Sequence, residues 1–288
     1  MTPTMTRTQA LTVPSARKRR FRWSDVSAHA PLIIAALVTL FPFFVMLVIS
    51  VQPGKAISLP GSLWPQKWDF SEFARLLSRG EMVGWIVNTT IYSVVSVVLV
   101  LVLSSMAAYA FAKLSFPGRS AVFMLMIAML MVPYHLTLIP QFIMVSEMGG
   151  LNTHWGLILP TIANVQALFL MRQFIAGIPQ ELIDAARIDG AGEMRIFWQI
   201  ILPQTKPILA TLGVFVFLWH WNDFLWPLVA NTKSSMYTLT VGLSSLNEEQ
   251  TSLAVTMAGA VITFVPIFII FIFLQRYFVR GVTMSGIK

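Results

Sequence analysis

The feature that most constrains this chain is a series of long apolar stretches without a charged residue. Five are long enough to cross about 30 Å of hydrocarbon as a helix, which takes roughly 20 residues, and a sixth carries one acid, Asp223, near its far end. In lipid, a helix satisfies its own backbone N–H and C=O groups. The sequence therefore predicts an all-α, polytopic membrane protein with six transmembrane helices, at about residues 30–51, 83–111, 120–140, 155–172, 207–228 and 252–275.

The composition agrees with a membrane location. Only 11% of the 288 residues are charged, against about 25% in soluble domains, which is too few to cover a soluble surface. The absence of cysteine excludes a disulfide scaffold and a zinc–thiolate site. The net charge of +8 can suggest nucleic acid, but most Lys and Arg residues flank apolar runs. We therefore expect contact with membrane lipid and no nucleic-acid partner.

The distribution of Lys and Arg predicts the orientation. Fifteen of the 20 fall in the N-terminal arm, two connections and the tail, all on one side if the N-terminus is cytoplasmic. This asymmetry predicts that both termini are cytoplasmic. We expect three regions: a basic cytoplasmic arm at residues 1–27, held near acidic lipid, a transmembrane domain at 28–280 and a cytoplasmic tail at 281–288.

The longest expected cytoplasmic connection, residues 172–206, contains signals for a helix, a bend and a second helix within residues 177–205. Pro179 suits a helix start, and the acids Glu181 and Asp184 follow in the first turns, where they interact favourably with the helix dipole. Gly190 allows a sharp bend. A second helix is expected over 194–202, ended by Pro203. Such an element beneath the membrane offers a surface that another protein can grip.

At these residues the chain resembles the inner-membrane permease subunits of ABC importers. Their cytoplasmic loop has the pattern EAA, three residues, Gly, nine residues, Ile, any residue, Leu-Pro. Asp184-Ala185-Ala186, Gly190, Ile200 and Leu202-Pro203 fall in this register, with Asp184 in place of Glu. The extended form, IPxELxxAAxxDGA, resembles the carbohydrate-uptake class. Its maltose-type (MalG-like) branch is also resembled by residues 104–119 (SSMAAYAFAKLSFPGR), 221–228 (WNDFLWPL) and 275–288 (QRYFVRGVTMSGIK).

The resemblance implies a permease domain at 28–280 that pairs with a second, homologous permease in a bacterial or archaeal plasma (inner) membrane. Two ATP-binding subunits would each receive one permease loop as a coupling helix, and an extracytoplasmic solute-binding protein would deliver the solute. The residues expected to contact the ATPase are Glu181, Asp184, Ala185, Ala186, Asp189, Gly190 and Ala191. The alternative is an ordinary amphipathic loop at the lipid headgroups.

The chain itself is not expected to be an enzyme. It contains no GxxxxGK[ST] phosphate loop, and the nearest fragment, residues 53–56 (PGKA), lacks the first Gly and the hydroxyl. The four His residues have no metal-ligand spacing, and no catalytic triad register occurs. We expect no catalytic residue, no metal and no cofactor in this chain, with ATP and Mg bound by the partner ATPase subunits.

An aromatic and polar cluster surrounds Asp223 in the fifth expected span. An acid at membrane depth usually faces water, a partner or a substrate, and aromatic faces with amide or carboxylate groups suit a sugar. The sequence leaves two interpretations open: a substrate path or gate, or an interfacial aromatic belt. The path residues would be Trp219, Trp221, Asn222, Asp223 and Trp226. Asn88, Tyr109 and Asn164 are further polar residues within spans, explained at least as well by interhelical hydrogen bonds.

We therefore expect a permease subunit for a carbohydrate, such as an oligosaccharide or a related polyol. A glycerol-phosphate permease is the main alternative, although a phosphate favours a cation in the path, and no Lys or Arg lies in the interior of an expected span. An ion-coupled secondary carrier would depend on Asp223 as its only acid within the spans. A membrane enzyme would need a catalytic constellation, which the sequence does not contain.

Overall fold

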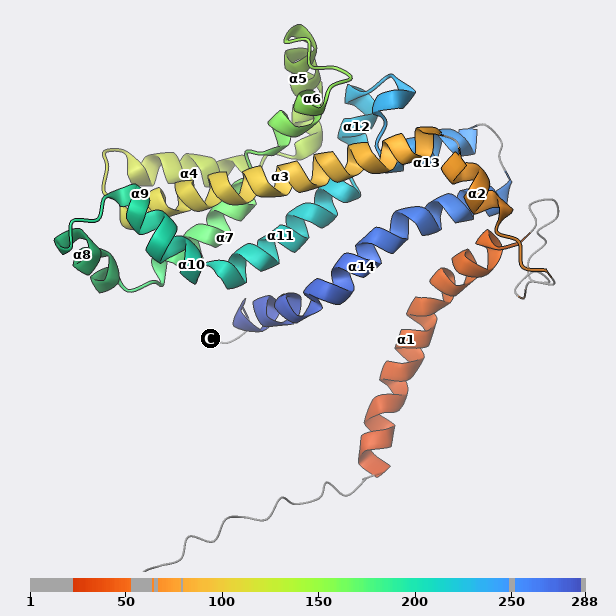
Figure 1. Cartoon of the computed structure of the whole chain (residues 1–288). Coiled ribbons are helices and arrows are strands. Elements are labelled where there is room, and N and C mark those ends of the chain that lie inside the picture. The colour runs from red at the N-terminus through yellow and green to blue at the C-terminus, as the bar shows by residue number, and fades with distance from the viewer. Residues whose placement is uncertain (1–22, 53–63, 65–66, 79, 249–251, 286–288) are drawn as a thin grey trace, which may run out of the picture. The chain divides into compact units, whose positions relative to one another are not determined.

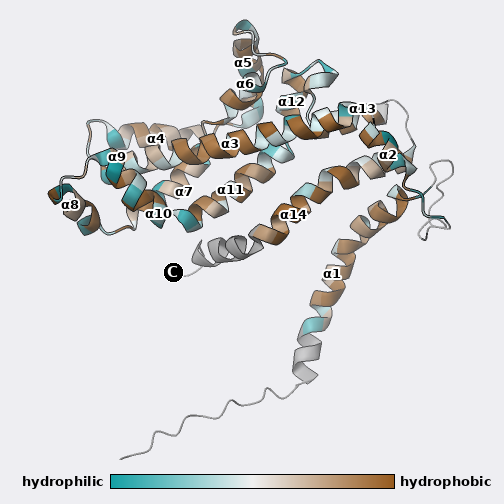
Figure 2. Ribbon diagram, in the orientation of Figure 1, coloured by the Kyte–Doolittle hydropathy of each residue, from teal (hydrophilic) through white to brown (hydrophobic). Residues whose placement is uncertain are grey.

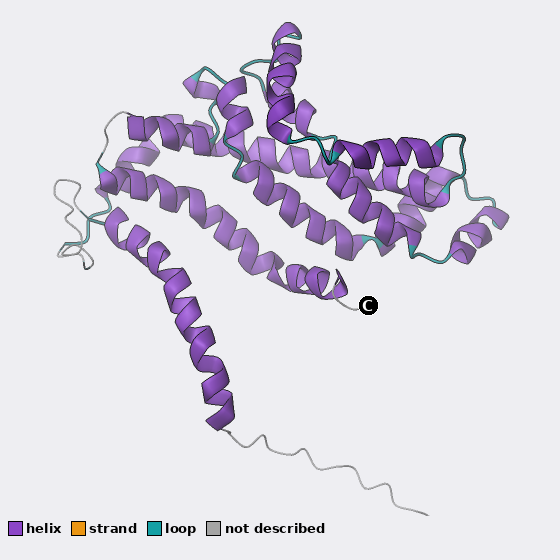
Figure 3. Ribbon diagram, turned by 180° about the vertical axis from the view of Figure 1, so that it is seen from behind, coloured by secondary structure: helices purple, strands orange, loops and turns teal. Residues whose placement is uncertain are grey.

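The computed structural model describes residues 23–52, 64, 67–78, 80–248 and 252–285. Every regular element within these ranges is helical (Figure 3), which confirms the predicted all-α class. The elements are α1 (Trp23–Ser50), α2 (Ser71–Ser78), α3 (Gly80–Lys113), α4 (Arg119–Met129), α5 (Tyr134–Glu147), α6 (His154–Ile158), η1 (Leu159–Thr161), α7 (Val165–Ala176), α8 (Gln180–Ile188), α9 (Glu193–Ile196), η2 (Phe197–Ile201), α10 (Leu202–Gln204), α11 (Lys206–Trp221), α12 (Leu225–Ala230), η3 (Ser234–Met236), α13 (Leu239–Glu248) and α14 (Leu253–Ser285).

The chain divides into two parts, residues 1–45 and 46–288. Most of α1 belongs to the first part and all the later helices to the second. Helix α1 begins at Trp23, inside the expected arm, and α14 continues to Ser285, inside the expected tail. Residues 1–22 of the arm, the fragment at 53–56 and the last residues of the tail lie outside the described ranges.

Among the described residues, three helices are long and apolar enough to span a membrane unbroken: His29–Ser50, Gly80–Lys113 and Leu253–Phe273. Three further candidates are bent pairs, which bring the total to six if each pair is one span. The sharpest bend, 100°, separates α4 from α5 inside the third expected span. Pro133 precedes α5 in an extended conformation, so the proline starts a new helix at this break, and α5 turns away from α4 (Figure 1).

Helix α3 is the central element of the second part and packs against both α7 and α11. Hydrophobic residues predominate along α3, α11 and the coloured part of α14 (Figure 2). The serines Ser93, Ser96, Ser104 and Ser105 of α3 are buried, and small residues of this kind allow membrane helices to approach closely. One apolar cluster joins the inner half of α3 to α7, α11 and the segment around α8. The residues expected to form the cytoplasmic loop are therefore packed onto the spanning helices.

A close approach between α13 and α3 gives a first testable prediction. A Cβ atom on Gly242 would collide with the ring of Trp85, which is buried and held by a 2.9 Å hydrogen bond from its Nε1 to the Ser234 carbonyl. Because the ring cannot move away freely, we expect Gly242→Ala to destabilise the protein by about 1–3 kcal/mol. Thermal unfolding in detergent should show a lower midpoint than for the wild type.

The matched control is Gly213→Ala on α11. There a Cβ would meet Leu101 Cδ1 at 3.5 Å, which is an ordinary van der Waals contact, and alanine favours the helix. This variant should unfold at or above the wild-type midpoint. Equal midpoints for the two alanine variants would contradict the proposed close approach of Gly242 to Trp85.

Candidate functional site

The bent segment predicted between the fourth and fifth spans forms, with an abrupt end to its first helix. Helix α8 follows Pro179, and Gly190 adopts a positive φ of 79°. The Gly190 N–H donates to the Arg187 carbonyl at 3.0 Å, and the Ala191 N–H donates to the Ala186 carbonyl at 2.9 Å. These two bonds form a Schellman motif, which satisfies carbonyls at the helix end and reverses the chain.

Helix α8 has one packed face and one free face. Ile183 and Ala186 are buried, whereas Ile188 is 87% exposed. The exposed members of the predicted contact set are Glu181, Asp184, Ala185, Asp189 and Gly190; Ala191 is half-buried and Ala186 is buried. The structure therefore brings acidic and small apolar groups together on the accessible side of α8. Ile188 adds an apolar side chain to this side, although it was not among the contact residues predicted from the sequence motif.

The second helical stretch of the bent segment, which we call its second arm, ends later than predicted; the first arm is α8. The helical stretch runs from Glu193 to Gln204 and does not stop before Pro203. Residues Phe197–Ile201 form a π-helical turn immediately before Leu202 and Pro203. A proline removes one backbone N–H and displaces the carbonyl a turn earlier, and a local π-turn can accommodate this disturbance. The chain bends by 78° after Gln204, before α11 begins.

An ion-pair network links the two arms of the bent segment. Arg187 Nε and Nη2 both contact Glu193 Oε1, at 2.9 and 2.8 Å, and Arg187 Nη1 lies 3.3 Å from Asp184 Oδ1. The hydrogen bond to Glu193 raises the pKa of Arg187 further above its usual range. The other Glu193 oxygen, Oε2, accepts a 2.5 Å hydrogen bond from the Tyr109 hydroxyl of α3. Glu193 thus connects the two arms to a spanning helix.

The polar cluster at the end of α11 is organised by α3. Asp223 lies between α11 and α12, and its Oδ2 accepts a 2.8 Å hydrogen bond from the Tyr92 hydroxyl. The Asp223 carbonyl accepts a 2.7 Å hydrogen bond from Thr240 Oγ1. The His220 ring lies 4.9 Å from the Tyr92 ring, edge to face. Helices α3 and α13 therefore meet the end of α11 at Asp223, α3 through the carboxylate and α13 through the backbone carbonyl.

The tryptophans predicted to line a path separate into two groups. Trp226 is fully buried and donates to the Leu157 carbonyl at 3.1 Å. Trp221 is 3% exposed and stacks on Phe217 at 5.3 Å. Trp219 and Asn222 are exposed. Within this chain, the accessible side of the cluster therefore carries Trp219 and Asn222 beside the half-buried Asp223, while the other two tryptophans pack the core.

Tyr92 and Thr240 were not singled out as site residues from the sequence. Tyr92 lies 131 residues before Asp223, and neither residue belongs to a local motif around the acid. The polar residues noted within spans have structural partners: the Asn88 amide donates to the Ser235 and Tyr237 carbonyls, and Asn164 caps the start of α7. The Asn88 contacts agree with the interpretation as hydrogen bonds between segments, whereas the Asn164 bond is local to the start of its own helix.

The described helices define a polytopic membrane subunit. The segment at residues 177–205, which contains α8, is folded and has an exposed side. The family described as "Binding-protein-dependent transport system inner membrane component" matches residues 100–284 by its sequence profile. The chain belongs to this family.

Individual relatives agree over most of the chain. The arabinooligosaccharides transport system permease protein AraQ of Halalkalibacterium halodurans is 37% identical over 258 residues, covering 88% of this chain and 92% of that protein. The sn-glycerol-3-phosphate transport system permease protein UgpE of Yersinia pestis is 33% identical over 276 residues, covering 92% and 98%. A chain of a bacterial ABC transporter that imports the acidic polysaccharide alginate superposes with a TM-score of 0.76 at 25% identity, covering 91% and 100%.

These similarities confirm the expected family and branch: the chain is an inner-membrane, multi-pass permease subunit of the carbohydrate-uptake, maltose-like class of ABC importers. It is a transport subunit and not an enzyme, and the family carries no cofactor in this subunit. The family description places the chain in a transport system that depends on a binding protein.

Proposed function

We propose that this chain forms the translocation path together with a second, homologous permease, and that two ATPase subunits drive the pair. In this assembly α8 is the coupling helix. The proposal is supported chiefly by one observation: the bend at Gly190 holds α8 with its small and acidic side chains exposed. Ala185 and Ile188 lie three residues apart on one side of α8 and are both exposed, so they offer a protein partner a small apolar surface between charged residues.

The coupling rests on differential contact. Closure of the ATPase pair on ATP would displace α8, and the displacement would favour one of two arrangements of the spanning helices. A partner can shift such an equilibrium only through contacts that differ between the two states. Buried side chains of α8 pack with those of α3, α7 and α11 in one apolar cluster. A displacement of α8 would therefore be transmitted to these spanning helices.

Reversing the charge of Glu181 tests the coupling helix. Glu181 is exposed in the first turn of α8, so Glu181→Lys should leave folding and membrane insertion intact. If this side faces the ATPase, the reversal should lower recovery of the ATPase with the permease by more than about tenfold, since a misplaced charge at an interface costs several kcal/mol. Co-purification and solute uptake measure the effect.

Glu147→Lys is the matched control, because it makes the same charge change at the exposed end of α5. It should leave ATPase recovery at the wild-type level. Normal recovery and normal uptake with Glu181→Lys would remove α8 as the coupling helix.

For the solute, we propose a neutral carbohydrate, an oligosaccharide or a related polyol. The named substrates of the relatives include arabino-oligosaccharides and glycerol 3-phosphate, so both classes must be compared. The polar side chains expected to line the path in this chain are Asn222 and Asp223. The Asp223 carboxylate would repel a phosphate, whereas hydroxyl groups suit it as hydrogen-bond donors. Family membership leaves the ion-coupled carrier without support.

Uptake by the complete importer in proteoliposomes distinguishes the solutes. We expect ATP-dependent accumulation of a labelled arabino-oligosaccharide or polyol, with no competition from glycerol 3-phosphate. Efficient uptake of glycerol 3-phosphate, with no carbohydrate transported, would favour the phosphate alternative and assign the necessary cation to the partner permease.

A further inference from the structure

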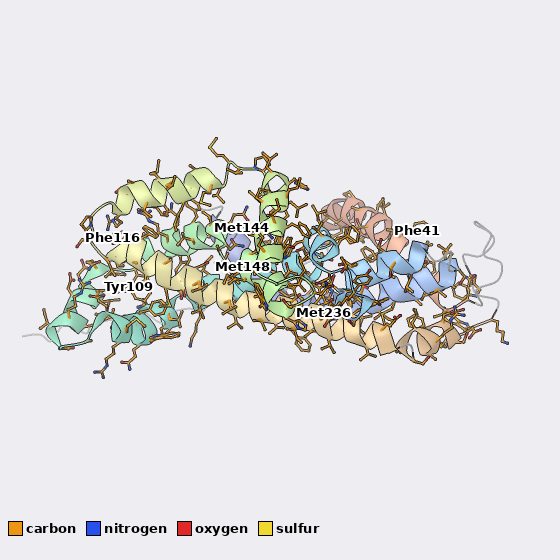
Figure 4. All side chains as sticks on the ribbon, turned by 90° about the horizontal axis from the view of Figure 1, so that it is seen from above. Phe41, Tyr109, Phe116, Met144, Met148 and Met236 are labelled. Carbon is orange, nitrogen blue, oxygen red and sulfur yellow. The ribbon has the colours of Figure 1, made fainter. Side chains whose placement is uncertain are left out.

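The inner end of α3 carries two polar side chains one helical turn apart, and they contact opposite ends of the segment containing α8. Lys113 Nζ donates to the Ile178 carbonyl at 2.5 Å and lies 3.4 Å from the Ala176 carbonyl, just before α8. The Tyr109 hydroxyl donates to Glu193, just after the bend. Figure 4 labels Tyr109 on α3 beside this segment. One helix therefore holds both the entry to and the exit from the coupling segment.

The hydrogen bonds of Tyr109 and Lys113 to this segment are supported by burial and by an ion pair. Tyr109 is 4% exposed and its ring packs against Phe197 at 5.9 Å. Its acceptor, Glu193, is also paired with Arg187 of α8, so displacement of α8 pulls on the same carboxylate. Hydrogen bonds to ionised groups are stronger than those between neutral groups. Lys113 adds a second attachment at the carbonyls that end α7.

The outer half of α3 is attached in a similar way to the segment that follows Asp223. Trp85 Nε1 donates to the Ser234 carbonyl, and Thr89 Oγ1 accepts from the Leu239 N–H at 2.7 Å. Tyr92 donates to Asp223. Helix α3 has 34 residues and is about 50 Å long at 1.5 Å per residue. A single helix thus joins the coupling segment to the Asp223 cluster.

The alternative route along the backbone is less direct. From the bent segment the chain passes through the π-turn Phe197–Ile201 and a 78° bend before it enters α11. A bend between two helices can absorb a displacement by changing its angle. The unbroken α3 has no such break.

We propose that α3 transmits the displacement of α8 to the Asp223 cluster, and that Tyr109 and Lys113 are the positioning residues that connect α8 to α3. This inference rests on the proposed coupling role of α8. It assigns the long-range connection to hydrogen bonds between a spanning helix and the coupling segment, rather than to the covalent path through α10 and α11.

The test uses a thiol reporter near Asp223. The chain has no cysteine, so Phe224→Cys, at a position 39% exposed, introduces the only thiol in this subunit. In the complete importer, a membrane-impermeant maleimide is added with and without Mg-ATP and vanadate, and labelling of this chain is followed on a gel. The reporter is first shown to retain uptake.

The variant Tyr109→Phe/Lys113→Met removes both attachments while keeping the size of the side chains. We expect the reporter with wild-type attachments to change its labelling rate severalfold on adding Mg-ATP and vanadate. In the double variant this change should fall by at least half, while the ATPase still co-purifies and hydrolyses ATP. Lys113→Arg, which keeps a donor, should restore part of the response in the Tyr109→Phe background relative to Lys113→Met.

Arg195→Ala is the control, since Arg195 Nε donates to Gln199 on its own helical stretch, at 3.1 Å. It should retain the full response. A full nucleotide response in the double variant would overturn the inference, and so would loss of ATPase binding, because Tyr109 and Lys113 would then only shape the docking surface. If substitutions within α8 itself leave uptake normal, the proposed function fails independently.

Discussion

Replacing Gly190 with proline is expected to abolish solute uptake without preventing insertion into the membrane. Gly190 has a φ of 79°, whereas proline is restricted to about −65°. The variant also loses the N–H that donates to the Arg187 carbonyl at 3.0 Å. The Schellman motif cannot form without both features, so the second arm would leave α8 in another direction. Glu193 would then no longer reach Arg187, and α8 would lose its orientation.

Two further substitutions separate backbone conformation from side-chain size. A Cβ at Gly190 would meet nothing within 4 Å, so the restriction there is conformational alone. Gly190→Asn should retain much of the uptake, because asparagine tolerates left-handed backbone better than other residues. Gly192 has a φ of −74° and equally open space, so Gly192→Ala should transport normally.

Solute uptake and the amount of the permease in the membrane, measured together, test whether the bend at Gly190 is needed for coupling. The expected order of uptake is wild type and Gly192→Ala, then Gly190→Asn, with Gly190→Pro inactive at normal expression. Transport by Gly190→Pro at the wild-type rate would show that the geometry of this bend is unnecessary for coupling.

The sequence predicted the possible number of membrane spans better than their shape. Hydropathy averages over a span-length window, so a stretch such as residues 120–140 gives the same signal whether it is straight or broken. The structure has a 100° break there, at Pro133. The order of apolar stretches thus predicts how many spans are possible, while bends depend on how the two halves pack against neighbouring helices.

The local geometry of the bent segment was predictable for a physical reason. Gly190 follows a helix-favouring stretch that includes Ala185 and Ala186, and a glycine in this place is a local signal for a helix end. The hydrogen bonds that form the bend are local as well. The continuation of the second arm through Pro203 was not predictable from the rule that proline ends helices. There the buried contacts of Ile196 and Ile201 favour a continuous helical stretch despite the lost N–H.

In the aromatic cluster, residue type alone does not predict which tryptophans are buried. Trp219, Trp221 and Trp226 are equally suited to a path or a core by residue type, and packing alone buries two of them. The hydroxyl partner of Asp223 comes from Tyr92, in another span. No short-range pattern indicates such a contact, which depends on how α3 packs against α11.

The acid at the centre of this cluster provides the second large expected effect. Asp223→Ala leaves the Tyr92 hydroxyl, which is fully buried, without its 2.8 Å acceptor. Loss of a hydrogen bond to a charged acceptor costs about 1.5–3 kcal/mol, and the carboxylate would also be missing from the expected path. We expect uptake to fall at least about tenfold, which corresponds to about 1.4 kcal/mol, with normal recovery of the partner subunits.

Asp223→Asn distinguishes hydrogen bonding from charge. Asparagine can still accept from Tyr92 and can contact the hydroxyls of a neutral carbohydrate, so this variant should keep most of the transport rate with at most a modest change in Km. Tyr92→Phe should give an intermediate loss, because Asp223 remains but loses its donor. Unchanged Km and rate in Asp223→Ala would instead assign the cluster to an interfacial belt. A loss that Asp223→Asn does not relieve would show that the negative charge itself acts on the solute.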